Sequence, residues 1–383
     1  MTRTDPPLGL RVAPHLAVVS VGYVMFGYAG VPEFYLGRYE IGYASFGLML
    51  SATLLPFVLV QWPASRLVKR TATTRLLIAA TVAQAALAST VDFAPTFPAA
   101  LGLRFLWGLG AGLVLSVGAT HVARLYDGDA ASRQQGVYGG MLTLGGAFGF
   151  LIAPRLAAAT NGIGIHALGA LGAVPAVGAL YRNRSDRLTA PPNAASGAAD
   201  ASALTDRVVL LASLCYVAAI GSYLTLSAFV TAYFEDVGIG GPLNALVLGV
   251  ATLGRAAGGS AVVGLPVTDP RVIAGASTVA ALGFGALAAA PSGPLRVGLP
   301  VLVMLAVSLP FGAIYNVAAG ATAAEGSALA TVIAIGNLVA LALPAVTGSI
   351  RDATGGYEGA FALLVGLNAL AVGSAVLIAR ARR

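Results

Sequence analysis

The sequence RNRSDRLTAPPNAASGAADASALTD, residues 182–206, interrupts an otherwise apolar chain near its middle. It is rich in Ala, Ser, Pro and Asp and has no apolar periodicity, which is the composition of a flexible connector. Long apolar runs lie on both sides of it. A run of about 20 apolar residues can cross a hydrocarbon core as a helix, whereas irregular backbone cannot face lipid. The stretch therefore predicts a linker between two membrane-embedded halves.

The composition excludes an ordinary soluble domain. Of the 383 residues, 57% are hydrophobic and 10% are charged, whereas about 25% of the residues of an average soluble chain are charged. The mean hydropathy is +0.85, and the 49 Gly and 20 Pro residues agree with the frequency of both in membrane helices. We expect the lipid bilayer to be the chain's main partner.

The charges and motifs also exclude several function classes. The net charge of +7 does not indicate a nucleic-acid partner, because the cations lie in short clusters between apolar runs. The lone Cys215 and the scattered His15, His121 and His166 give no metal-ligand spacing. The chain has no phosphate-binding Gly-rich loop and no nucleophile–base set. We expect no enzyme activity, no cofactor and no metal.

We predict an all-α membrane protein with twelve transmembrane helices in two pseudo-symmetric halves. The N-terminal half covers residues 1–181, the cytoplasmic linker residues 182–206 and the C-terminal half residues 207–383. The predicted helices lie near residues 11–34, 44–64, 75–94, 97–123, 134–158, 162–181, 207–233, 242–265, 271–290, 295–319, 327–349 and 357–379.

The positions of Lys and Arg predict the orientation, because short cytoplasmic loops carry an excess of both. With an even number of helices, the two termini share a side. If that side is cytoplasmic, sixteen of the 22 Lys and Arg residues lie inside and four outside. We therefore predict a multi-pass protein of the cytoplasmic membrane with both termini in the cytoplasm.

An internal repeat supports the two halves. Residues 110–120 read GAGLVLSVGAT and residues 312–322 read GAIYNVAAGAT. Ala-Thr-Leu occurs at residues 52–54 and again at 251–253, at nearly the same offset. The matches fall on corresponding predicted helices, as they do in transporters built from repeated halves.

Three local motifs accompany this organisation. Residues 61–70 read QWPASRLVKR, residues 103–112 read LRFLWGLGAG, and Gly136, Gly145 and Gly149 follow one another along the fifth predicted helix. Together with the pattern of six helices, linker and six helices, these motifs resemble those of the major facilitator superfamily over essentially the whole chain. The resemblance implies a secondary active transporter that works by alternating access.

The first motif resembles the superfamily's Gly-x-x-x-Asp-Arg-x-Gly-Arg-Arg/Lys loop between the second and third helices. Arg66, Lys69 and Arg70 keep its cations, but Ser65 replaces the Asp and both glycines are absent. The resemblance implies a gating role for these three cations, and the missing acid puts the superfamily's latch in doubt. The positive-inside rule alone would also place cations here.

The second motif resembles Arg-x-x-x-Gly-x-Gly of the fourth helix, with Arg104, Gly108 and Gly110 in register. A charge within a membrane helix costs at least about 2.5–3.5 kcal/mol, so Arg104 needs a partner inside the protein. The resemblance links it to proton transfer. A structural Arg that joins neighbouring helices is the alternative.

The third motif resembles the antiporter signature Gly-x8-Gly-x3-Gly-Pro. Gly136, Gly145 and Gly149 have the required spacing, but Phe150 replaces the Pro. The resemblance implies a gating role for these glycines and exchange rather than uptake. Ordinary packing of small residues would produce the same pattern.

Arg255 is the leading candidate for binding the solute. It lies about ten residues, or roughly 15 Å, from the cytoplasmic end of its predicted helix and so near the bilayer midplane. Transporter sites of this architecture lie at that depth, and a guanidinium offers a two-pronged donor to carboxylate, nitrate or phosphate. Superfamily nitrate porters use a second Arg, where this repeat has Pro56. A packing role is the alternative.

Polar and aromatic residues within other apolar runs complete the predicted substrate site. An amide side chain does not gain from facing lipid, so it bonds to another helix or to solute. The predicted substrate-binding residues are Arg255, Arg104, Tyr23, Tyr28, Tyr223, Tyr315, Asn316 and Asn337. We expect Asp92, at the outer end of its helix, to face solvent.

We predict a transporter of a small organic or inorganic anion, with proton coupling left open, and expect a single chain to suffice. A proton-coupled multidrug or metabolite efflux pump is the alternative within the same class. A membrane sensor or assembly factor that does not transport is the alternative from another class. The sequence does not identify the solute, the coupling ion or the direction of transport.

Overall fold

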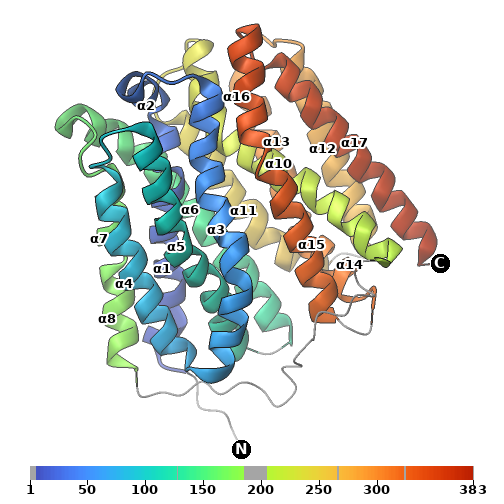
Figure 1. Cartoon of the computed structure of the whole chain (residues 1–383). Helices are drawn as coiled ribbons and strands as arrows, with labels where there is room; N and C mark the ends of the chain where they lie inside the picture. The colour runs from blue at the N-terminus through green and yellow to red at the C-terminus, as the bar shows by residue number, and fades with distance from the viewer. Residues whose placement is uncertain (1–5, 127, 185–204, 265–266, 323–324, 383) are drawn as a thin grey trace, which may run out of the picture. The chain divides into compact units, whose positions relative to one another are not determined.

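The computed structural model describes residues 6–126, 128–184, 205–264, 267–322 and 325–382, and these ranges contain helices but no strand. Most of the predicted linker lies outside the described residues. The elements, shown in Figure 1, are α1 (Leu8–Gly27), η1 (Tyr28–Gly30), α2 (Pro32–Tyr39), α3 (Tyr43–Arg70), α4 (Thr73–Val91), α5 (Phe97–Leu125), α6 (Gly128–Thr160), α7 (Ile165–Leu171), α8 (Val174–Arg182), α10 (Arg207–Asp236), α11 (Leu243–Gly264), α12 (Asp269–Ala288), α13 (Leu295–Ser308), α14 (Phe311–Ala319), α15 (Glu325–Ala340), α16 (Leu343–Thr354) and α17 (Glu358–Ala381).

The all-α prediction is confirmed for the described residues. Ten helical segments there are long and apolar enough to cross a membrane, and Leu243–Gly258 is a shorter apolar helix. The sixth predicted span, residues 162–181, consists of the two short helices α7 and α8. The number twelve stays a prediction.

Prolines lie at three breaks within the predicted helices. Pro175 stands in the first turn of α8, Pro310 separates α13 from α14, and Pro344 stands in the first turn of α16. Proline has no backbone N–H to donate, so it is tolerated where a helix begins and disfavoured in its interior. A new helix therefore begins at each of these three prolines.

Residues 65–70, predicted to lie in the loop after the helix 44–64, instead continue α3 to its end. The glycines that the superfamily's loop motif has at its ends are absent here, and Leu67 and Val68 continue a helix-compatible run. No glycine ends the helix in this stretch, and Pro63 is accommodated inside it. Arg66, Lys69 and Arg70 are consequently exposed side chains of a helix end.

The described chain forms two compact units. The first contains α1, η1, α4 to α8 and the part of α3 from Ala52 onward. The second contains α10 to α17 and the part of α3 up to Ser51. Helix α3 therefore contributes residues to both units.

In the first unit, glycines bring α1 and α6 into close contact along most of their length (Figure 1). A Cβ atom on Gly22 would overlap the carbonyl oxygen of Leu142, and one on Gly145 would overlap that of Val19. A Cβ on Gly149 would lie 3.0 Å from the Cα of Gly27. Small residues allow helix backbones to approach in this way.

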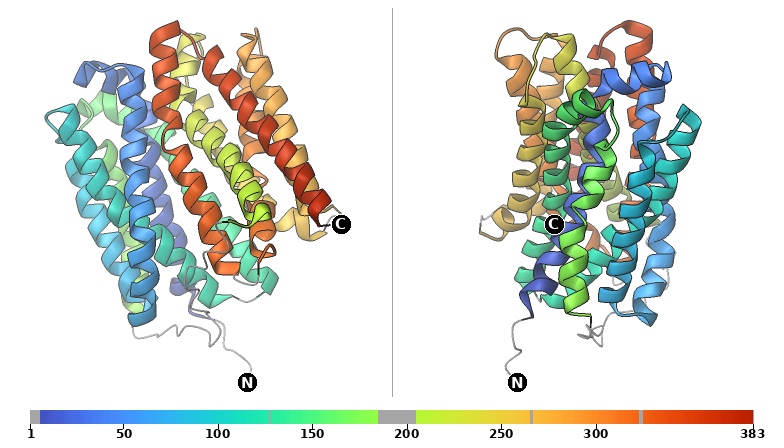
Figure 2. Two further views of the ribbon diagram at one scale, coloured as in Figure 1. Left: turned by 45° about the vertical axis from the view of Figure 1, so that its right-hand side comes forward. Right: turned by 90° about the vertical axis from the view of Figure 1, so that its left-hand side faces the viewer.

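In the second unit, α12 packs along α17 (Figure 2), and the start of α3 packs on α16. The carboxylate of Asp352 accepts hydrogen bonds from the backbone N–H groups of Tyr43 and Ala44, both at 2.8 Å. The Ser51 hydroxyl donates to the carbonyl oxygen of Leu341 at 2.6 Å. A carboxylate at a helix N-terminus satisfies unbonded N–H groups and is favoured by the helix dipole.

The close contact of α1 and α6 predicts that Gly145→Ala destabilises the protein. The added methyl group meets the carbonyl oxygen of Val19 and forces the two backbones apart. Overpacking of this kind costs about 1–3 kcal/mol. We expect a lower midpoint of thermal unfolding in detergent than for the wild type.

Gly178→Ala is the matched control, because a Cβ on this α8 residue of the same unit meets no atom within 4 Å. Alanine is favoured over glycine within a helix by roughly 0.5–1 kcal/mol. Its midpoint should stay the same or rise. An unchanged midpoint for Gly145→Ala would contradict the close approach of α1 and α6.

Candidate functional site

Arg104 belongs to the first unit and is fully buried on α5. Its Nη1 atom lies 2.9 Å from Nε2 of His166, and its Nη2 donates to the carbonyl oxygen of Met25 at 3.0 Å. The guanidinium carbon lies 4.3 Å from the ring centre of Tyr28. Arg104 therefore joins α5 to α1, η1 and α7, as a buried membrane charge requires.

Asp92 follows α4 and is 3% exposed, so the expectation that it faces solvent is wrong. One carboxylate oxygen lies 2.6 Å from Nδ1 of His166. The other accepts from the backbone N–H groups of Gly164, His166 and Ala167 at 3.0–3.1 Å. Asp92 thus caps the first turn of α7 from a different helix. A carboxylate in this place satisfies N–H groups that α7 leaves unbonded.

The surroundings lower the pKa of Asp92. Burial raises it, but the electrostatic interaction with His166 and the hydrogen bonds from His166 and Ala167 together lower the pKa below the usual 3.8. Hydrogen bonds donated to a carboxylate favour its ionised form. Asp92 is therefore a carboxylate at neutral pH.

A chain of neutral hydrogen bonds runs beside this cluster in the same unit. The Trp107 indole donates to Gln84 at 3.0 Å, the Gln84 amide donates to Ser20 at 3.0 Å, and the Ser20 hydroxyl donates to the carbonyl oxygen of Gly169 at 2.7 Å. These bonds join α5, α4, α1 and α7. Networks in which each member has a partner make buried packing specific.

Arg255 lies in the second unit, on α11. Two glycines of α11 bring the helix close to the end of α13: a Cβ on Gly254 would lie 2.8 Å from that of Ser308, and one on Gly258 would overlap the carbonyl oxygen of Leu309. The next helix, α14, begins directly after Pro310. The side chain of Arg255 consequently meets residues of α10 and α14.

Aromatic rings cover the Arg255 guanidinium. Its carbon lies 4.5 Å from the ring centre of Tyr223 on α10 and 4.2 Å from that of Phe311 on α14. Tyr216 stands edge-on to Phe311 at 5.7 Å and lies 5.8 Å from Tyr315. A cation over aromatic faces gains about 0.5–2 kcal/mol, more as water is excluded.

The N–H groups of Arg255 remain largely unused. Within the described part of the chain, its buried Nε and Nη2 atoms have no hydrogen-bond partner, and no carboxylate forms an ion pair with it. Leaving a buried donor without an acceptor costs about 1–3 kcal/mol, and more for a charged group. Arg255 is therefore a cation that is stacked but not hydrogen-bonded by Nε and Nη2.

The other predicted substrate residues lie in varied places. Tyr23 is buried against Gly169, and within the described residues its hydroxyl has no hydrogen-bond partner. Asn316 is exposed and donates to Asp269 at 3.4 Å, and Asn337 is half-buried on α15. Their roles stay predictions. The predicted gating glycines Gly136, Gly145 and Gly149 all lie on α6.

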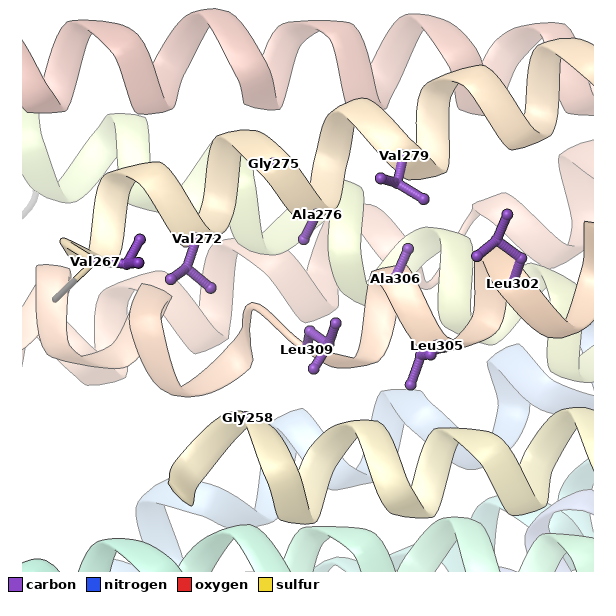
Figure 3. Close-up of a pocket in the computed structure, with 10 residues that line it drawn as sticks. All are labelled: Gly258, Val267, Val272, Gly275, Ala276, Val279, Leu302, Leu305, Ala306 and Leu309. Carbon is purple, nitrogen blue, oxygen red and sulfur yellow. The ribbon is translucent and has the colours of Figure 1, made fainter. Parts of the chain in front are cut away.

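A cavity of about 490 Å³ lies between α11, α12 and α13 (Figure 3). Its lining is apolar: Gly258, Val267, Val272, Gly275, Ala276, Val279, Leu302, Leu305, Ala306 and Leu309. Three of these, Val267, Val279 and Leu302, are more than a third exposed. Among the described residues, the lining offers no charged or hydrogen-bonding side chain that could orient a polar solute.

Comparison with known proteins decides the family. A family model described as Major Facilitator Superfamily matches residues 15–344. The chain belongs to this superfamily. The predicted resemblance is thereby confirmed, and the protein is a multi-pass membrane transporter. Membership also fits the prediction that it is not an enzyme, because the superfamily consists of transporters.

Two crystal structures have the same fold as this chain. Both are of a bacterial homolog to the human lysosomal transporter Spinster, one in an inward-facing and occupied conformation and one in an inward-facing and unoccupied conformation. Each matches with a TM-score of 0.74 and 15% sequence identity, covering 97% of this chain and 96% of that chain. No curated protein matches in sequence.

The sequence did not identify Asp92 and His166, which together position Arg104. Asp92 ends one apolar run and His166 begins another, so each resembles a polar residue at a membrane surface. They meet because α4 packs against α7. The signal available in the sequence is the glycine pair Gly162 and Gly164, which favours a tight turn immediately before His166. Both glycines have positive φ in the structure.

The lowered pKa of Asp92 predicts that its stabilising effect depends on pH. Asp92→Asn keeps an oxygen for the α7 N–H groups but loses the charge beside His166, so we expect it to unfold at a lower temperature than the wild type at pH 7. A carboxyl group whose pKa is lower in the folded than in the unfolded state stabilises the fold at pH values above its unfolded pKa. This stabilisation is lost as the pH falls through its folded pKa. The difference should therefore narrow between pH 5 and pH 3.

Asp236→Asn is the control, because Asp236 pairs with Arg351 at 2.8 Å while 31% of its side chain is exposed. Exposed ion pairs contribute about 0–1 kcal/mol. This variant should unfold close to the wild type. A difference between wild type and Asp92→Asn that is equal at pH 5 and pH 3 would contradict the proposed charge of Asp92.

Proposed function

We propose that this chain is a secondary active transporter that moves a small organic or inorganic anion across the cytoplasmic membrane by alternating access. In this proposal Arg255 binds the anion, and Tyr223 and Tyr315 stand around it. Both termini lie in the cytoplasm, and a single chain carries out transport without a cofactor. Arg66, Lys69 and Arg70 on α3 and the glycines of α6 serve the gates.

The observation that carries this proposal is the state of the Arg255 guanidinium. Its faces are covered by Tyr223 and Phe311, while its Nε and Nη2 atoms lack acceptors in the described residues. An oxyanion accepts two parallel hydrogen bonds from a guanidinium edge. A bound oxyanion would satisfy the buried donors of Arg255, which otherwise cost free energy because they lack acceptors.

The charge of the site favours an anion over an organic cation. The rings alone could hold a cation, since aromatic faces attract positive charge. Arg255 already occupies two of these faces and would repel a second cation in a medium of low dielectric constant. A cationic drug would therefore have to displace the arginine, whereas an anion pairs with it.

The proposal predicts that Arg255→Ala abolishes anion uptake. Loss of a hydrogen bond to a charged group costs about 1.5–3 kcal/mol, which corresponds to at least a tenfold loss of affinity. The measurement is uptake by the purified protein in liposomes from a panel of small anions and organic cations, with and without a pH gradient. Arg255→Lys should keep part of the uptake, because it restores the charge without the two-pronged donor.

Arg271→Ala is the matched control, since it removes the same charge from an exposed position at the start of α12, and its uptake should resemble that of the wild type. Drug or cation flux that does not depend on Arg255 would make efflux the better assignment. If no tested solute moves under any gradient, the protein is better described as a sensor or assembly factor on a transporter scaffold.

A further inference from the structure

The contacts of His166 determine which of its ring nitrogens carries the proton. Arginine has only donors and keeps its charge in proteins. Nε2 of His166, which lies 2.9 Å from Nη1 of Arg104, must therefore accept. The ring proton then sits on Nδ1 and donates to Asp92 at 2.6 Å. In this arrangement His166 is neutral, with a bare Nε2.

We propose that Nε2 of His166 is a proton-binding site of this transporter, for which the Arg104 guanidinium competes. A proton on Nε2 turns that atom from an acceptor into a donor, so it cannot bond to Arg104. The proton and Arg104 exclude each other at this atom. The inference does not depend on which solute is carried.

The imidazole ring is anchored through its Nδ1 atom. Asp92 is fixed by the backbone N–H groups of Gly164, His166 and Ala167 and in turn holds Nδ1 of the ring. Arg104 is held by the carbonyl oxygen of Met25 and by the ring face of Tyr28, at the end of a long flexible side chain. Proton binding therefore displaces Arg104 and leaves His166 in place.

The groups around His166 come from several elements. Asp92 at the end of α4 favours the protonated ring, whereas Arg104 on α5 opposes it. Tyr23 on α1 lies against α7 at Gly169, and Tyr28 lies under Arg104. On α6, the exposed Arg155 donates to the carbonyl oxygen of Leu151 in its own helix. Among the described residues, Asp92 and Arg104 are charged groups in direct contact with the ring.

Linkage makes the competition reciprocal. Any conformational change that draws Arg104 away from His166 raises the affinity of Nε2 for a proton. Proton binding in turn favours conformations in which Arg104 has left. The site can therefore couple a proton to a rearrangement of α5 against α7 and α1.

The test is nuclear magnetic resonance of the protein in lipid nanodiscs with ¹⁵N-labelled histidine. The chain has 3 histidines, so H15Q and H121Q assign the His166 signals by elimination, even if H166Q does not fold. At neutral pH we expect a protonated Nδ1 and a bare Nε2, and on acidification a single step in which Nε2 gains a proton.

Arg104→Met removes the competitor and should raise the midpoint of this step by about one pH unit or more, a tenfold or greater gain in proton affinity. Arg155→Met removes an exposed charge of the same unit and should leave the midpoint in place. A proton on Nε2 at neutral pH, an Nε2 that stays bare from pH 9 to pH 4 in both wild type and Arg104→Met, or a midpoint that Arg104→Met does not move would overturn the proposal.

Discussion

A guanidinium inside a membrane helix stays positively charged, because arginine does not lose its proton in proteins. The surrounding helices must therefore accommodate a cation in a medium where an unpaired charge is costly. Arg104 and Arg255 do so in opposite ways. Arg104 directs its N–H groups at His166 and at the carbonyl oxygen of Met25. Arg255 directs its faces at Tyr223 and Phe311 and leaves Nε and Nη2 without an acceptor among the described residues. The first arrangement is closed, whereas the second leaves donors to which a ligand could supply an acceptor.

The closed arrangement explains why unrelated parts of the first unit depend on one another. Arg104 requires an acceptor, which fixes His166 as a neutral ring with its proton on Nδ1. That proton requires a strong acceptor, which Asp92 supplies, and the carboxylate in turn requires donors. The first turn of α7 provides them as unbonded N–H groups. A chain of hydrogen bonds thus runs from a cation on α5 to the N-terminus of α7, and loss of any member leaves its neighbours unsatisfied.

The sequence predicts this fold well and its sites only in part. Apolar runs of membrane-spanning length, separated by the polar stretch 182–206, predict an all-α membrane protein because lipid permits few alternatives. The breaks at Pro175, Pro310 and Pro344 carry a signal, but prolines such as Pro56 and Pro154 lie inside unbroken helices, so tertiary packing decides which proline ends a helix. Arg104 and Arg255 can be identified as candidate site residues from the sequence because each places a charge inside an apolar run. Asp92 and His166 cannot be identified in this way, because they lie 74 positions apart at the ends of apolar runs, where polar residues are expected.

The two proposed sites together constrain how transport responds to the membrane potential. The cluster of Asp92, His166 and Arg104 has no net charge when His166 is neutral, and a bound proton makes it positive. The Arg255 site is positive when empty, and a bound monovalent anion makes it neutral. A transporter that binds one proton and one such anion therefore carries the same net charge as the empty protein. Movement of one uncompensated charge across the membrane involves about 2.3 kcal/mol per 100 mV. When both ligands bind together, this electrical work cancels over a transport cycle. The pH gradient, rather than the membrane potential, would then drive transport.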